Sequence, residues 1–107
     1  HIEDYCDLSS TFFSPPAHYF LQVYGDSMVN AGIFDGDLLA VHSSSEVRQG
    51  QIAVVRIDEE VTVKRWNRLS GTRVNLVAEN DAYEPIQLDL SQDSVAIEGI
   101  SVGVIRR

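Results

Sequence analysis

Ser27 is the best placed of the chain's eleven serines to act as a nucleophile. It lies within Gly25-Asp26-Ser27-Met28, directly after a predicted strand and at the entry to a possible helical turn. That position exposes the hydroxyl and directs free backbone N–H groups toward the same point, which suits an oxyanion. The position suits a serine that caps the helical turn equally well, so the residues alone leave both interpretations open.

Lys64 is the candidate base, and it is the only lysine among eight basic side chains. The alternation of residue types predicts a strand in which Lys64 shares one face with Thr62 and Trp66. A lysine among apolar neighbours loses hydration, which disfavours the ammonium form and lowers the pKa toward a neutral amine. A Ser-Lys pair also needs no third residue to set a tautomer. The alternative is a lysine that lies along the sheet edge with its charge in water.

Other kinds of site have weaker support. His42 precedes three serines, but the sequence places no Asp behind it, so a Ser-His-Asp triad is less favoured. Cys6 and three scattered histidines lack zinc-ligand spacing. Asp35-Gly36-Asp37 resembles the start of a calcium loop without the later ligands, and is interpreted as a tight turn. The chain has no phosphate-binding glycine loop, and we expect neither a metal nor a cofactor.

Composition limits the classes of protein that this chain can represent. Its 107 residues suffice for one domain with a core, at 44% hydrophobic and 22% charged residues. The net charge of −8 disfavours binding to phosphate, so we do not expect this domain to bind nucleic acid by itself. A single cysteine excludes an internal disulfide, and no apolar run approaches the roughly 20 residues of a membrane span. These features indicate a reducing cytoplasm.

The elements that must position Ser27 and Lys64 are predicted to be strands. Short alternating runs between turn residues predict an all-β domain with a compact, highly curved sheet. Only residues 27–33 could hold a short helical turn, no helix exceeds two turns, and residues 1–17 are expected to be an irregular lead-in. The predicted strands are 19–24, 37–42, 51–57, 61–66, 72–78 and one or two segments within 94–105, with 51–66 forming a hairpin.

Three motifs in order resemble the carboxy-terminal domain of LexA-type repressors, which are related to UmuD-type mutagenesis proteins and to self-cleaving phage repressors. The resemblance covers nearly the whole chain, and the separation of 37 residues between Ser27 and Lys64 makes it specific. The motifs are Gly25-Asp26-Ser27-Met28, the run from Gly32 to Val41 and Glu60-Val61-Thr62-Val63-Lys64-Arg65, followed by Glu79-Asn80, Pro85-Ile86 and the run from Ile97 to Arg107.

The resemblance implies a self-cleaving serine peptidase with a sheet of the LexA and signal-peptidase type. By this resemblance, Ser27 would be the nucleophile and Lys64 the general base. Backbone N–H groups at Ser27 and its neighbour would hold the oxyanion. The substrate would be one Ala-Gly or Cys-Gly bond of the same chain, upstream of His1. The Ala31-Gly32 pair lies inside a matching motif, so we interpret it as scaffold.

The resemblance also implies partners. RecA filaments on single-stranded DNA stimulate cleavage in this family, which derepresses the SOS genes of the DNA-damage response in the bacterial cytoplasm. Operator DNA is bound only through an N-terminal winged helix-turn-helix domain, which we expect to belong to a longer parent chain. This domain would form a homodimer through its last strand, because Val102 to Ile105 is apolar and an unpaired edge there would be adhesive. No membrane is implied.

Two alternatives share the Ser-Lys chemistry. Asp26 also occurs in UmuD-type relatives, so a self-processed subunit of a translesion DNA polymerase is the main alternative, although residues 37–65 and 97–107 favour the LexA type. A signal peptidase is the second alternative, and the lack of an apolar span argues against it.

Overall fold

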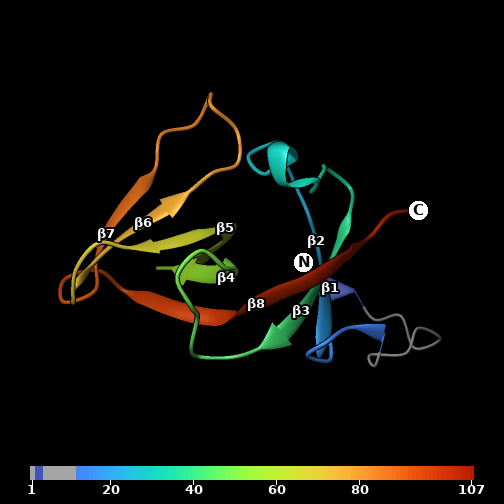
Figure 1. Ribbon diagram of the computed structural model, residues 1–107, viewed down its shortest axis with the longest axis horizontal. Helices are drawn as coiled ribbons and strands as arrows, with labels where there is room; N and C mark the ends of the chain where they lie inside the picture. The colour runs from blue at the N-terminus through green and yellow to red at the C-terminus, as the bar shows by residue number, and fades with distance from the viewer. Residues whose placement is uncertain (1, 4–11) are drawn as a thin grey trace.

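Eight strands form one antiparallel sheet in the computed structural model, which describes residues 2–3 and 12–107 (Figure 1). His1 and Cys6 lie outside the described residues. The strands are β1 (Ile2–Glu3), β2 (Tyr19–Gln22), β3 (Leu38–Ser43), β4 (Ile52–Ile57), β5 (Glu60–Arg68), β6 (Arg73–Val77), β7 (Ile86–Asp89) and β8 (Val95–Ile105). None of the helical segments within these residues is long and apolar enough to cross a membrane.

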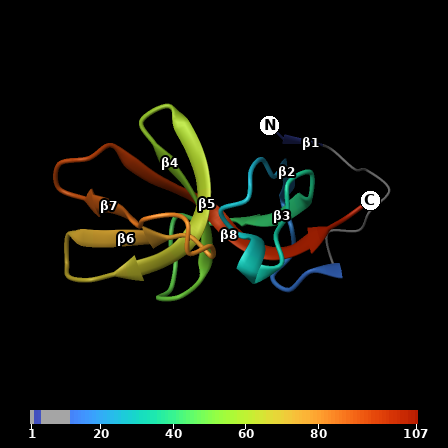
Figure 2. The same cartoon turned by 90° about the horizontal axis from the view of Figure 1, so that it is seen from above.

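The long strand β8 joins two halves of the sheet. The strand order is β1-β2-β3-β8-β4-β5-β6-β7, so β8 pairs with β3 through residues 99–105 and with β4 through residues 95–100. Seen from above, β1–β3 lie on one side of the molecule and β4–β7 on the other, with β8 crossing between them (Figure 2). Register shifts at Ala40/Val41 and at Val54/Val55 accompany this crossing, and such bulges bend and twist the strands that contain them.

Apolar residues from both halves fill the space between them. One cluster contains residues of β3 and β4 together with residues of the segment that follows β2, which ties the two halves to one core. Its buried members are Leu21, Val23, Met28, Ile33, Leu39, Val41 and Val54. A second cluster lies within the β4–β7 half and includes Trp66, Val74, Leu76 and Leu88. The alternating apolar residues of the strands therefore form the core that the curved sheet encloses.

The predicted all-β fold is confirmed, with differences in its details. The helical turn after Ser27 is the three-residue 3₁₀ turn η2 (Val29–Ala31), and the 94–105 segment is one strand rather than two. Strand β7 was not predicted, and β1 shows that the 1–17 segment is not wholly irregular. The predicted strand 19–24 ends at Gln22, because Val23 pairs instead with the Gly36–Asp37 turn.

Gly99 lies at the point where β8 passes from one half to the other. It is opposite Ser43 in β3 and opposite Val54 in β4. A Cβ atom at Gly99 would lie 2.5 Å from the carbonyl oxygen of His42 and 2.6 Å from a methyl carbon of Val41. Only a residue without a Cβ permits this close approach of the two backbones.

We expect Gly99→Ala to lower the free energy of unfolding by about 1–3 kcal/mol, because backbone atoms must move to accommodate the methyl group. Gly71→Ala is the matched control, since a Cβ there meets no atom within 4 Å and we expect a change within about 0.5 kcal/mol. Urea denaturation of both variants tests this, and equal stabilities would contradict the assigned role of Gly99.

Candidate active site

Ser27 lies in the turn between β2 and η2. Gly25 takes a positive φ of 83°, which favours glycine, and its amide donates a hydrogen bond to the Asp35 carboxylate at 2.7 Å. The residue at the N-cap of η2 is Met28, which makes no side-chain capping bond. The interpretation of Ser27 as a capping serine is therefore wrong, and its hydroxyl is directed elsewhere.

Lys64 lies in the middle of β5 and meets the Ser27 hydroxyl. The Nζ atom of Lys64 is 3.0 Å from Oγ of Ser27, 2.7 Å from Oγ1 of Thr62 and 3.1 Å from the carbonyl oxygen of Val63. The side chain is buried, with only 9% of the residue exposed. The interpretation of Lys64 as a solvated edge lysine is therefore wrong. The structure brings together the two residues that the sequence singled out.

The environment of Lys64 favours its neutral form. Burial removes hydration from the ammonium and holds the pKa of Lys64 below the ordinary lysine value. Lys64 takes part in none of the ion pairs between the residues that the structure describes, so no carboxylate opposes this effect. A neutral amine at hydrogen-bonding distance from a serine hydroxyl can accept the hydroxyl proton, which is the chemistry of a general base.

A small cavity of about 150 Å³ opens beside the pair. Its polar lining includes Ser27, Thr62 and Lys64, and the apolar lining comes from both halves of the sheet. The apolar residues include Leu21, Val23, Met28, Val61 and Val63. Polar groups that converge in an apolar recess are typical of a site that binds and orients a substrate.

The backbone around Ser27 supplies free hydrogen-bond donors. Among the described residues, the amides of Ser27 and Met28 donate no hydrogen bond. Free amides next to a nucleophile can stabilise the negative charge that develops on an attacked carbonyl oxygen. The turn that presents the Ser27 hydroxyl can therefore present an oxyanion site as well.

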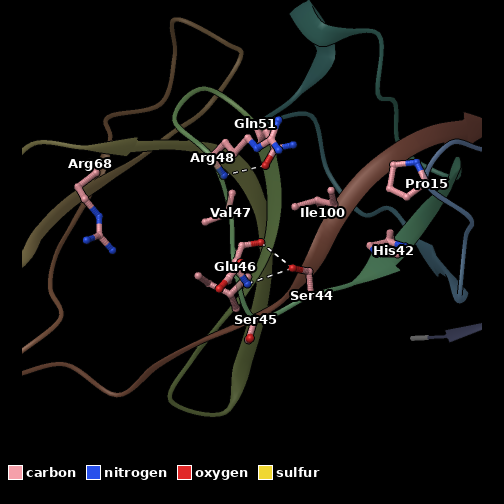
Figure 3. Close-up of a pocket in the computed structure, with 11 residues that line it drawn as sticks. Pro15, His42, Ser44, Ser45, Glu46, Val47, Arg48, Gln51, Arg68 and Ile100 are labelled. Carbon is pink, nitrogen blue, oxygen red and sulfur yellow. Dashed lines mark hydrogen bonds between the residues drawn. The ribbon is translucent and has the colours of Figure 1, made fainter.

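His42 belongs to a different part of the molecule. It lines a larger, open cavity of about 670 Å³, together with Ser44, Glu46 and Arg48 (Figure 3). Its Nδ1 donates a hydrogen bond to the carbonyl oxygen of Pro16 at 2.8 Å, and no described serine hydroxyl bonds to it. Ser44 instead donates to the carbonyl oxygen of Glu46 at 2.8 Å. The structure therefore provides no Ser-His-Asp triad here.

The Asp35-Gly36-Asp37 segment forms a turn, in agreement with its interpretation from sequence. Asp37 is 2% exposed, and its carboxylate accepts two hydrogen bonds from Arg106, both at 2.8 Å. These bonds hold the pKa of Asp37 below its usual range. Among the described residues, no group of three or more His, Cys, Asp or Glu side chains is arranged to hold a metal ion.

Sequence reasoning missed the side chains that support the Ser27 turn. Asn80 and Tyr83 both contact Asp26, the residue before the serine. Glu79 pairs with Arg65, the residue after the lysine. The Glu79-Asn80 motif was recognised, but nothing in the local sequence indicates that its partners lie near Ser27.

The sequence of the chain is similar to those of known proteins. Residues 1–102 match the Peptidase S24-like family. Over 107 residues the chain is 57% identical to the LexA repressor of Marinobacter nauticus and 56% identical to that of Ectopseudomonas mendocina. It is also 56% identical to the LexA repressor of Cellvibrio japonicus. Each match covers 100% of this chain but only 52–54% of the relative, so the chain spans about half the length of these curated relatives.

The lowered pKa of Lys64 predicts how stability depends on pH. Unfolded Lys64 has an ordinary pKa of about 10.4. Between the lowered native pKa and this value, the unfolded chain binds more protons than the native one, so stability rises with pH. The free energy of unfolding of the unmodified protein, minus that of Lys64→Met, should therefore increase as the pH is raised. Urea denaturation of both proteins from about pH 7 to pH 10 measures this difference, and a constant difference would contradict the lowered pKa.

Proposed function

This chain belongs to the peptidase S24-like family, and from that premise we propose that it is the self-cleaving and dimerisation domain of a LexA-type repressor. Ser27 is the nucleophile and Lys64 the general base, and residues 1–107 form a single domain. One observation carries the proposal: the buried amine of Lys64, with no carboxylate partner among the described residues, lies 3.0 Å from the Ser27 hydroxyl.

The reaction proceeds in two stages, each with a proton transfer through Lys64. The neutral amine takes the Ser27 proton while Oγ attacks the scissile carbonyl carbon, and the oxyanion is held by free amides at the Ser27 turn. The resulting ammonium donates its proton to the departing peptide amine, which leaves an ester on Ser27. Lys64, again neutral, then takes a proton from water as the resulting hydroxide attacks the ester. The ammonium returns this proton to the departing Ser27 oxygen, which restores the neutral amine and the serine hydroxyl and releases a carboxylic acid that ionises in water.

The substrate is one Ala-Gly or Cys-Gly bond upstream of His1 in a longer chain. RecA filaments on single-stranded DNA stimulate its cleavage, and a separate N-terminal domain binds the operator DNA. These three proposals rest on the LexA-type resemblance and on relatives about twice as long as this chain. The Ala31-Gly32 pair is not the scissile bond, because it closes η2 and the carbonyl oxygen of Gly32 accepts a hydrogen bond from Arg106 at 3.0 Å.

Cleavage in trans tests the catalytic pair. We expect this chain to cut a full-length LexA repressor whose own nucleophilic serine is replaced by alanine, and the rate should rise with pH. The rise should level off below the pH expected for an ordinary lysine, because burial lowers the Lys64 pKa. The reaction will be slow, since the high effective concentration of a tethered substrate is lost. Mass spectrometry of the products at several pH values measures both the rate and the bond that is cut.

Two variants act as controls for this test. Ser27→Ala should abolish cleavage because the attacking oxygen is gone. Lys64→Arg keeps the charge and most of the bulk but cannot give up its proton, so it should lose at least about 100-fold in rate. A Lys64→Arg protein that cleaves as fast as the unmodified one would rule out the Ser-Lys mechanism.

The C-terminal half of β8 is the surface that we propose for dimerisation. Residues 101–105 pair with β3 along one edge, and no described strand pairs with their other edge. Val102, Val104 and Ile105 on this segment are apolar and only partly buried. Antiparallel pairing with the same segment of a second copy would satisfy both free edges around a two-fold axis.

Sedimentation analysis tests the dimer. We expect the unmodified domain to sediment as a dimer at micromolar concentration. Val104→Pro removes one backbone donor from the strand and should shift the population toward monomer, while circular dichroism confirms that the sheet persists. A monomer for the unmodified domain would contradict this interface.

A further inference from the structure

The loop between β6 and β7 approaches the turn that carries Ser27. We call residues Glu79–Tyr83 of this loop the brace. In Figure 1 the brace lies in the orange loop that faces the 3₁₀ turn near the top of the molecule. Nδ2 of Asn80 donates a hydrogen bond to the carbonyl oxygen of Asp26 at 2.9 Å, and the hydroxyl of Tyr83 donates to the Asp26 carboxylate. Both bonds hold the residue immediately before Ser27.

The brace also contacts the far side of the Ser27 turn and the strand that carries the lysine. The carbonyl oxygen of Glu79 accepts a hydrogen bond from the amide of Asn30 at 2.8 Å. The carboxylate of Glu79 pairs with the guanidinium of Arg65, the residue after Lys64. One short segment thus links the neighbours of the two residues in the proposed pair.

The hydrogen bond from Asn80 to the carbonyl oxygen of Asp26 also fixes the direction of the Ser27 amide. The carbonyl of Asp26 and the N–H of Ser27 belong to the same planar trans peptide unit, so they point in opposite directions. Holding the carbonyl toward Asn80 therefore directs the Ser27 amide away from the brace. That amide donates no hydrogen bond within the described residues, so it remains available to a ligand.

The brace is ordered by its own hydrogen bonds, which gives Asn80 a defined direction. Oδ1 of Asn80 accepts a bond from the amide of Ala82 at 3.0 Å, and its carbonyl oxygen accepts one from the amide of Tyr83 at 3.1 Å. With Oδ1 engaged inside the loop, Nδ2 is the atom left to face Asp26. Tyr83 is 45% exposed, so the brace lies at the surface and adds little to the core.

We propose that Asn80 and Tyr83 are positioning residues that orient the Ser27 amide as an oxyanion donor. This inference rests on the proposed function, because it assigns a role within the same reaction. The two side chains act through Asp26 and touch no reacting atom. A preorganised donor accelerates acyl transfer because it needs no reorientation when the negative charge develops. Asn80 and Tyr83 therefore act on the oxyanion and leave the contacts of the base unchanged.

Trans cleavage of the serine-inactivated repressor, followed across pH, separates these two effects. Asn80→Ala should lower the rate plateau at high pH by about 10- to 100-fold, since one oxyanion donor becomes misdirected. The midpoint of the pH profile should stay in place, because the contacts of Lys64 with Thr62 and Val63 remain. Tyr83→Phe removes one hydroxyl and should lower the plateau by about five-fold, which keeps the test open if Asn80→Ala folds poorly.

Two further variants serve as controls. Asn67→Ala removes an asparagine whose side chain bonds to Gln49 rather than to the Ser27 turn, and it should retain the full plateau. Asp26→Asn keeps the Oδ1 acceptor for Tyr83 and should retain most of the rate. Asp26→Ala removes that acceptor and should lower the rate plateau by as much as Tyr83→Phe does. Combining Asp26→Ala with Tyr83→Phe should cost no more than either change alone, because both remove the same bond.

Labelling of Ser27 by a fluorophosphonate gives a second readout without the protein substrate. Its phosphoryl oxygen occupies the oxyanion position, so Asn80→Ala should slow labelling in parallel with cleavage. An unchanged plateau in Asn80→Ala and Tyr83→Phe would overturn the inference, as would a loss that appears only as a shifted midpoint. If the unmodified protein neither cleaves nor labels more than Ser27→Ala, the proposed function fails and the inference falls with it.

Discussion

The constraint on which the rest of this structure depends is the burial of the Lys64 amine without a carboxylate partner among the described residues. In water Lys64 would hold its proton, and beside a carboxylate it would hold the proton more strongly. The chain carries sixteen acidic side chains, yet Lys64 joins none of the ion pairs among the described residues. Its partners are the uncharged oxygens of Ser27, Thr62 and Val63, which orient the amine without stabilising the ammonium as a carboxylate would.

Strands that are not neighbours in the sheet must meet to satisfy this constraint. Ser27 follows β2 and Lys64 lies in β5, and three strands separate β2 from β5 in the sheet order. The sheet therefore has to curl, and β8 with its flanking bulges provides the bend. Gly99 allows the close approach of backbones at that bend. A glycine that is not part of the proposed pair thus supports the bend that brings the two halves of the sheet together.

The local setting made Ser27 and Lys64 candidates and left a capping serine and an edge lysine as alternatives, and the LexA-type resemblance then assigned the two roles. Ser27 follows a strand and a glycine, and Lys64 is the one lysine of an arginine-rich set, within an alternating strand. Strand β7 could not be predicted in this way, because four residues after a proline become a strand only through pairing with β6. The brace was missed for a similar reason. Asn80 has the local sequence of a turn, and its partner Asp26 lies 54 residues away.

The order of the strands also implies when the site can form. Strands β4 to β7 pair in successive hairpins, which close short loops, whereas β3 and β4 are not paired with each other in the described sheet and both pair with the last strand. In the unfolded chain the Ser27 turn and β5 are apart, and Lys64 is a hydrated lysine with an ordinary pKa. Such a lysine is protonated at neutral pH and cannot accept the Ser27 proton. The desolvation that would make Lys64 a base is therefore a property of the closed sheet, and the proposed activity belongs only to the completely folded chain.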